Sequence, residues 1–132
     1  MFGCSAARPR DLGLVNGTLR PCPETLNCVS SEAGTPEAQR IEPLLAVNGR
    51  YEMGRLTAIL KRWPRTVVVA DSGTYIHAEF TTRVLRFVDD VEFRFDPATE
   101  VVHVRSASRV GRRDMGTNRS HIEALRERLK VF

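Results

Sequence analysis

Residues 75–105 read YIHAEFTTRVLRFVDDVEFRFDPATEVVHVR, and this stretch decides the fold. Apolar and polar residues alternate along three runs of it, which predicts three β-strands joined by two tight hairpins. The alternation gathers ionisable side chains on one face of the predicted sheet: His77, Glu79, Asp90, Glu92, His103 and Arg105. Such groups are costly to gather unless the face is wet, mutually paired or functional. We therefore expect any chemistry to lie on this polar face.

Tight two-residue loops fix which residues face each other across the strands. With loops at Arg83-Val84 and Pro97-Ala98, apolar residues meet apolar residues throughout, and a slip by one residue would mix the two faces. This register predicts two rows of polar side chains across the sheet: His77–Asp90–Arg105 and Tyr75–Glu92–His103.

The two rows have two interpretations, and the sequence leaves both open. In the first, the rows line a cleft, where a carboxylate beside a histidine orients the imidazole and raises its pKa, as general-base and metal-ligand sites require. In the second, the rows are a ladder of opposite charges on a solvated face, and each pair contributes a fraction of a kcal/mol to stability.

Asp89 interrupts the alternation, because it falls on the apolar face between Phe87 and Val91. A buried carboxylate needs partners, so we expect an arginine or a helix-terminus N–H beside it and a structural role. A β-bulge at Asp89-Asp90 is the alternative, and it would shift the register.

The chain as a whole predicts a single domain. Residues 1–46 are rich in proline and turn signals, which predicts an extended arm that wraps an α+β core formed by residues 47–132. Within the core, apolar spacing predicts a helix that ends at Trp63, since Pro64 follows, and a buried strand over residues 66–71.

A final helix is predicted from about Asn118 to Lys130. Ser120 and Glu123 resemble a capping box, and Thr117 is an equally good start. Together with the strands, the two helices predict a four-stranded antiparallel β-meander with both helices packed on one face.

The composition is ordinary for a folded domain, with 42% hydrophobic and 27% charged residues. No apolar run approaches the ~20 residues of a membrane-spanning helix. The net charge of +4 comes almost wholly from arginine, which suits phosphate and carboxylate recognition. Nucleic-acid binding is not expected, because interleaved aromatic residues are missing and 16 acidic residues dilute the charge.

The cysteines are informative about the cellular compartment of the protein. Cys22 and Cys28, in RPCPETLNCVSS, could close a small disulfide loop in an exported protein, and no finger-like zinc spacing is present. The chain as it stands predicts a cytoplasmic protein. If the natural start lies upstream, Cys4 in MFGCSA would be a lipid anchor, and the protein would be periplasmic or a membrane-anchored lipoprotein.

A run of arginines precedes the last helix in RSASRVGRRDMGTNRS, residues 105–120. Arginines around a helix N-terminus suit an anion, and pairing with nearby Asp and Glu is the alternative. The candidate anion ligands are Arg109, Arg112, Arg113 and Arg119. No Walker or dinucleotide-binding spacing is present.

Three segments together resemble the domain of unknown function 1499 family: RPCPETLNCVSS, YIHAEFTTRVLRFVDDVEFRFDP and VVHVRSASRVGRRDMGTNR. The family consists of small bacterial and plastid proteins, many of them secreted or lipid-anchored, and the resemblance covers residues 8–131. It implies no activity, substrate or cofactor. The residues that match family motif positions are Cys22, Asn27, Cys28, His77, Glu79, Phe80, Asp89, Asp90, Glu92, Arg105, Ser106 and Arg109. Arg112-Arg113 departs from the family pattern.

Three functions from different classes are compatible with these features. The leading hypothesis is a non-catalytic binding module that recognises a small molecule or a protein partner with the polar sheet face. The second is a hydrolytic or metal-assisted enzyme that uses His77 with Asp90 and Glu79, and His103 with Glu92. The third is a protein whose arm and arginine-rich loop bind an anion or an acidic partner.

We expect no cofactor and no tightly bound metal. Two imidazoles and two carboxylates on one face suit zinc, iron or manganese. In the predicted register, however, His77 and His103 lie on strands separated by a third strand, so their Cα atoms should be roughly 10 Å or more apart.

Overall fold

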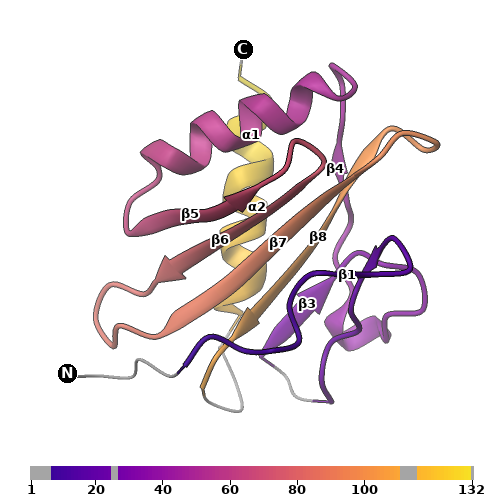
Figure 1. Cartoon of the computed structure of the whole chain (residues 1–132). Coiled ribbons are helices and arrows are strands. Elements are labelled where there is room, and N and C mark those ends of the chain that lie inside the picture. Colours follow the sequence, from indigo (N-terminus) through magenta and orange to yellow (C-terminus); the bar gives the residue numbers. More distant parts are fainter. Residues whose placement is uncertain (1–6, 25–26, 111–115, 132) are drawn as a thin grey trace.

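The computed structural model describes residues 7–24, 27–110 and 116–131. Its centre is one antiparallel sheet with two helices across one face, α1 (Tyr51–Arg62) and α2 (Thr117–Leu129) (Figure 1). Four strands that are consecutive in the chain are neighbours in this sheet: β5 (Thr66–Asp71), β6 (Tyr75–Thr81), β7 (Val88–Asp96) and β8 (Val101–Ser108). The expected α+β class, with two helices and an antiparallel sheet, is confirmed.

The sheet holds more strands than the predicted four-stranded meander. β3 (Cys28–Ser30) and β4 (Leu44–Leu45) both pair antiparallel with β8, which makes the sheet six-stranded. Runs of two or three residues are too short for alternation to show, so the sequence pattern of the arm did not reveal them. The remaining short elements are the paired strands β1 (Leu14–Val15) and β2 (Thr18–Leu19) and the 3-10 turn η1 (Glu37–Gln39).

The predicted register is wrong by two residues in both hairpins. Glu92 lies opposite Arg105 rather than His103, and His77 lies opposite Glu92 rather than Asp90. Because side chains repeat every two residues along a strand, a slip of two keeps every residue on its predicted face. The polar face is therefore where the sequence places it, although its pairs differ.

The error comes from the loops, which span residues 82–87 and 97–100 instead of two residues each. In the second loop, the Asp96 side chain accepts a hydrogen bond from the N–H of Ala98 at 3.0 Å. The N–H of Glu100 donates to the Asp96 carbonyl at 2.9 Å, and Glu100 has a φ of 56°. Glu100 thus takes the left-handed conformation that a longer turn requires, without a glycine to announce it.

The hydrophobic core lies between the helices and the apolar face of the sheet. Both helices bury the stripes that their apolar spacing predicts: Met53, Leu56 and Leu60 on α1, and Ile122, Leu125 and Leu129 on α2. The second helix begins at Thr117, one of the two expected starts, after Gly116 with a φ of 83°. The capping box at Ser120 is wrong, because Ser120 lies inside the first turn.

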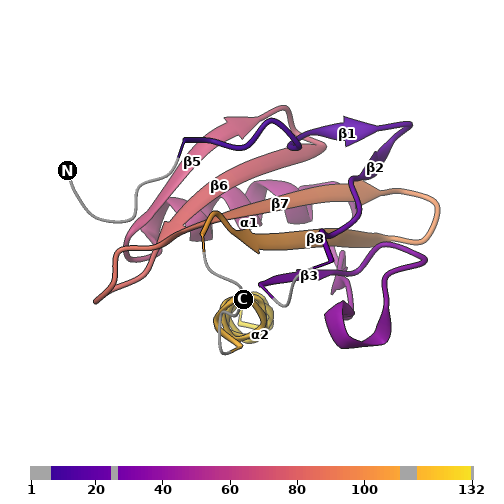
Figure 2. The same cartoon turned by 90° about the horizontal axis from the view of Figure 1, so that it is seen from below.

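The opposite, polar face of the sheet lies under the beginning of the chain. In Figure 2, β1 and β2 lie on one side of the sheet and α2 on the other. We call residues 8–20 the strap. Leu19 is buried within it, but residues 14–18 are exposed.

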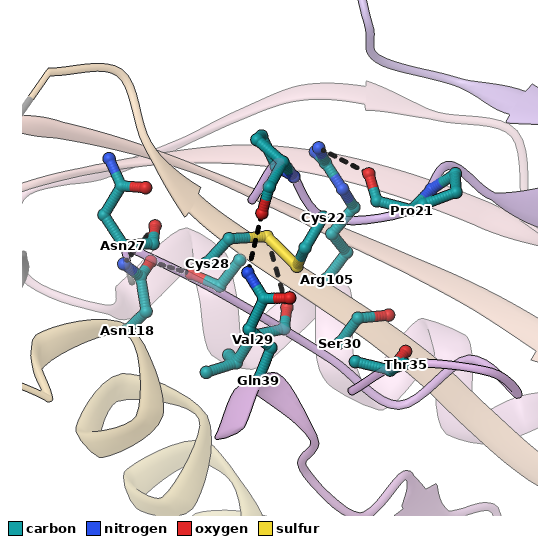
Figure 3. Close-up of a disulfide and its surroundings, with 12 residues drawn as sticks. Pro21, Cys22, Asn27, Cys28, Val29, Ser30, Thr35, Gln39, Arg105 and Asn118 are labelled. Carbon is teal, nitrogen blue, oxygen red and sulfur yellow. Dashed lines mark hydrogen bonds between the residues drawn. A yellow bond between two sulfur atoms is a disulfide. The ribbon is translucent and has the colours of Figure 1, made fainter. Parts of the chain in front are cut away.

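A disulfide ties the end of the strap to the sheet. Cys22 and Cys28 are bonded, with their Cα atoms 5.8 Å apart. Figure 3 shows the bridge beside Arg105, whose guanidinium donates a hydrogen bond to the Pro21 carbonyl at 3.3 Å. On the other side, the amide of Gln39 donates to the Pro23 carbonyl at 2.7 Å.

We expect the double variant Cys22→Ser plus Cys28→Ser to unfold with a free energy lower by about 2 kcal/mol, because the loop that the bridge closes is short. Urea denaturation followed by circular dichroism measures this difference. Intact mass with and without reductant measures the bridge itself: protein from an oxidising compartment should gain two hydrogens on reduction. Free thiols at both Cys22 and Cys28 in that protein would contradict the bridge.

Candidate functional site

The first part of the polar face is a buried ionic network centred on Asp90. The Nε2 atom of His77 lies 2.8 Å from Asp90 Oδ1, and both side chains are buried. The Arg109 guanidinium binds Asp90 with two hydrogen bonds of 2.8 and 3.0 Å and also donates to Glu79 at 2.5 Å. From the strap, Arg8 reaches the same Glu79 oxygen at 2.7 Å. The expected contact of Asp90 with Arg105 is replaced by this contact with Arg109.

The charges in this network favour ionised Asp90. Burial alone would raise the pKa of Asp90, but the hydrogen bonds from His77 and Arg109 outweigh it, so the pKa is lowered. The hydrogen bond with Asp90 raises the pKa of Arg109 in turn. Asp90 therefore remains an anion at neutral pH and is a weak base.

The second part of the polar face is centred on Glu92. The Tyr75 hydroxyl donates to Glu92 at 2.5 Å, and Arg105 lies 3.4 Å from the other carboxylate oxygen. The strap adds two contacts: the N–H of Gly13 donates to Glu92 at 2.7 Å, and Asp11 lies 3.2 Å from Arg105. Burial, followed by the hydrogen bond to Glu92 and the charge of Glu92, raises the pKa of Tyr75.

His103 does not join Glu92 in a row. It lies opposite Arg94, and its Nδ1 is 3.0 Å from the Ser31 hydroxyl. Its other ring nitrogen lies 3.9 Å from Asp96. The predicted Tyr75–Glu92 contact exists, and the predicted Glu92–His103 contact does not.

Arg94 and Glu32 form a third charged pair, which sequence reasoning missed. Arg94 donates to the Glu32 carboxylate at 2.5 and 2.8 Å, and the N–H of Leu19 in the strap donates to it at 2.9 Å. Burial alone would raise the pKa of Glu32, but these hydrogen bonds outweigh it and lower the pKa. Arg94 shares the alternation of Glu92, and this signal could have placed it on the polar face. Glu32 lies in the arm, where no pattern indicated it.

Asp89 lies on the helix side of the sheet, as its position in the alternation predicts. It accepts a hydrogen bond from the Ser108 hydroxyl at 2.7 Å and lies 3.6 Å from Nδ1 of His121 in α2. The arginine or helix-terminus N–H that we expected beside Asp89 stays a prediction. The pairing of β7 with β8 runs without a shift through Asp89 and Asp90, so the alternative of a β-bulge there is wrong.

A model of the family described as "Protein of unknown function (DUF1499)" matches residues 18–129. The chain belongs to this family. Comparisons with curated proteins and with solved structures gave no match. The DUF1499 match includes both bonded cysteines and the polar face from Tyr75 to Arg109, but Arg8, Asp11 and Gly13 of the strap lie before its first residue.

The candidate anion ligands of this DUF1499 chain do not converge in the described residues. Arg109 binds the carboxylates of the first network. Arg119 donates to the backbone carbonyls of Arg40 and Ala38 at 2.7 and 3.4 Å. Arg112 and Arg113 lie outside the residues that the structure describes.

The DUF1499 polar face does bring three metal-type ligands together. One ligand atom from each of His77, Glu79 and Asp90 lies within 4.8 Å of the others. A histidine with two carboxylates suits zinc, iron or manganese. Here Arg109 occupies both carboxylates, so a metal ion would have to displace its guanidinium.

Neither helix of the described residues has the length and apolar character that crossing a membrane requires.

Proposed function

We propose that this domain is a non-catalytic binding module that holds a peptide segment of a partner protein on its polar sheet face. The observation on which this rests is the strap itself. Its polar contacts with the face include Arg8 with Glu79, Asp11 with Arg105, and the Gly13 N–H with Glu92. The face thus already holds a peptide segment, one that belongs to the same chain.

The first residues of the strap, before the buried Leu19, are attached weakly enough to be exchanged. The side chains of Arg8 and Asp11 are 54% and 50% exposed, and ion pairs of this kind contribute about 0–1 kcal/mol each. By contrast, Glu92 and Arg105 are fully buried on neighbouring strands. A partner segment with a cation, an anion and a free N–H at the same spacing would find the same partners on the sheet.

The protonation and pairing of the face support binding rather than catalysis. The Asp90 carboxylate is hydrogen-bonded to His77 and Arg109, and its lowered pKa makes it a poor general base. Glu92 is likewise occupied by Tyr75 and Arg105. Groups that are paired in this way orient a ligand by complementary charge.

A labelled peptide of residues 7–14 (ARPRDLGL) tests the proposal in a fluorescence anisotropy titration of the full chain. In the wild-type protein the strap competes with the peptide. Arg8→Ala plus Asp11→Ala weakens the strap, so this variant should bind the peptide roughly tenfold more tightly. The control variant Arg10→Ala should behave as wild type, because Arg10 is exposed and has no ion pair or hydrogen bond to the sheet among the described residues.

Two further measurements give the experiment its specificity. A peptide in which the residues corresponding to Arg8 and Asp11 are exchanged should no longer bind the Arg8→Ala plus Asp11→Ala variant (the weakened-strap variant) more tightly than the wild type. Adding Glu79→Gln to the weakened-strap variant should reduce its affinity for the original peptide. Equal affinity of wild type and the weakened-strap variant for the peptide would refute the proposal.

A metal-assisted enzyme is the second candidate, and the convergence of His77, Glu79 and Asp90 favours it. These residues would hold the ion, which would supply Lewis-acid chemistry. Elemental analysis of untagged protein distinguishes the two candidates: near-stoichiometric zinc or iron that is lost in His77→Ala would place the enzyme ahead of the binding module.

A further inference from the structure

The β6–β7 hairpin tip exposes two large apolar side chains between two arginines. Val84 is 82% and Leu85 61% exposed, and Arg83 and Arg86 flank them, both exposed. Arg86 has a φ of 60°, which turns the chain at the tip. Isolated exposed apolar residues are common, but an adjacent pair on a projecting loop is a feature of interaction sites.

A second basic and aromatic segment lies beside this tip. The turn between α1 and β5 contains Trp63, which is partly buried against the core, and Arg65. The Arg65 carbonyl accepts from the N–H of Thr81 at 2.9 Å, and its side chain donates to the Thr81 carbonyl at 3.2 Å. A hollow of about 310 Å³ between the two segments is lined in part by Trp63, Arg65 and Arg83.

The two segments form one surface, which we call the basic end: Trp63, Arg65, Arg83, Val84, Leu85 and Arg86. The sequence has no acidic residue from 53 to 70 or from 80 to 88, so its arginines have no acidic neighbours along these segments. In Figure 1 the β6–β7 hairpin is at the lower left and the β7–β8 hairpin at the upper right, so the two lie at opposite ends of the sheet.

We propose that the basic end docks on the surface of an anionic lipid bilayer. Val84 and Leu85 would enter the boundary between headgroups and acyl chains, and the arginines on either side would contact lipid phosphates. Trp63, which lines the same hollow as Arg83, is the residue type that prefers the headgroup level. An apolar pair that projects from a loop, with cations around it, matches a soft, negatively charged interface better than the rigid surface of an acidic protein.

Vesicle co-sedimentation with the full chain tests this. The protein should bind vesicles of equal parts phosphatidylglycerol and phosphatidylcholine and should dissociate from them at high salt. It should not bind vesicles that contain only phosphatidylcholine. Arg83→Gln plus Arg86→Gln should weaken binding about fivefold for each arginine removed. Val84→Ser plus Leu85→Ser should also weaken it.

Matched control variants lie at the other end of the fold. Leu45→Ser plus Val47→Ser removes two side chains that are 69% and 68% exposed, and Arg50→Gln plus Lys130→Gln removes two exposed cations. Both controls should bind vesicles as wild type does, and thermal unfolding should be unchanged in the test variants because their side chains are exposed.

Several outcomes would overturn the proposal. These are failure to bind the anionic vesicles, equal loss of binding in test and control variants, and binding that is indifferent to Val84→Ser plus Leu85→Ser. Binding to heparin with the same sensitivity to the arginines, together with indifference to the apolar pair, would indicate a general polyanion surface instead of a bilayer site.

Discussion

Arg105→Met is expected to lower the free energy of unfolding by about 3–5 kcal/mol. Arg105 is 1% exposed and lies beside Glu92, which is fully buried. Methionine fills a similar volume but leaves the Glu92 carboxylate in the sheet without its cation, and an uncompensated buried charge is strongly destabilising. Urea denaturation followed by circular dichroism measures the loss.

The double variant Arg105→Met plus Glu92→Gln separates the ion pair from mere packing. Glutamine has no charge to compensate and still accepts the hydrogen bonds from Tyr75 and the Gly13 N–H. We therefore expect the double variant to be more stable than Arg105→Met alone. If the two changes were simply additive, the pairing of Glu92 with Arg105 would contribute nothing.

Arg109→Met should have an effect of similar size, about 3–5 kcal/mol, because it leaves Asp90 and Glu79 close together without their shared cation. The control is Arg119→Met, since Arg119 binds only exposed backbone carbonyls among its described contacts; it should cost well under ~1 kcal/mol. A loss in Arg109→Met no larger than in the control would contradict the network.

The same variant should respond differently to pH and to metal ions. Arg109 helps to lower the pKa of Asp90, so the wild-type protein has this stabilisation above an unfolded-state pKa of about 3.9 and loses it as the pH falls through the lower folded-state value. The free energy of unfolding of Arg109→Met should therefore fall less than that of the wild type over this pH range.

Removing the Arg109 guanidinium also frees the carboxylates beside His77, so added zinc should raise the melting temperature of the variant and leave that of the wild type unchanged.

The sequence was sufficient for the faces of the sheet and insufficient for its pairs. Alternation has a period of two, so His77 and Glu92 lie on the polar face as predicted, although the predicted register of both hairpins was wrong by two residues. The loops were unpredictable because Arg86 and Glu100 take positive φ values without the glycine that usually marks them. The helices were predictable because the apolar spacing that defines each buried stripe lies within one short stretch of sequence.

The missed partners of the candidate site come from distant parts of the chain. Arg8 binds Glu79, Asp11 binds Arg105 and Glu32 binds Arg94 across the fold. A single arginine or aspartate in an irregular arm is marked in the sequence neither by periodic spacing nor by a flanking motif. Only the tertiary structure, in which the arm lies over the sheet, brings these residues to the polar face.

The pairing of β3 with β8 sets an order of events during synthesis. Cys28 lies opposite Ala107, so β3 leaves the ribosome long before its partner strand exists. Cys22 and Cys28 need no such partner, because they are separated by six positions in the chain and their bridge depends on a local loop closure. In an oxidising compartment the Cys22–Cys28 loop can therefore close before β8 is available to pair with β3.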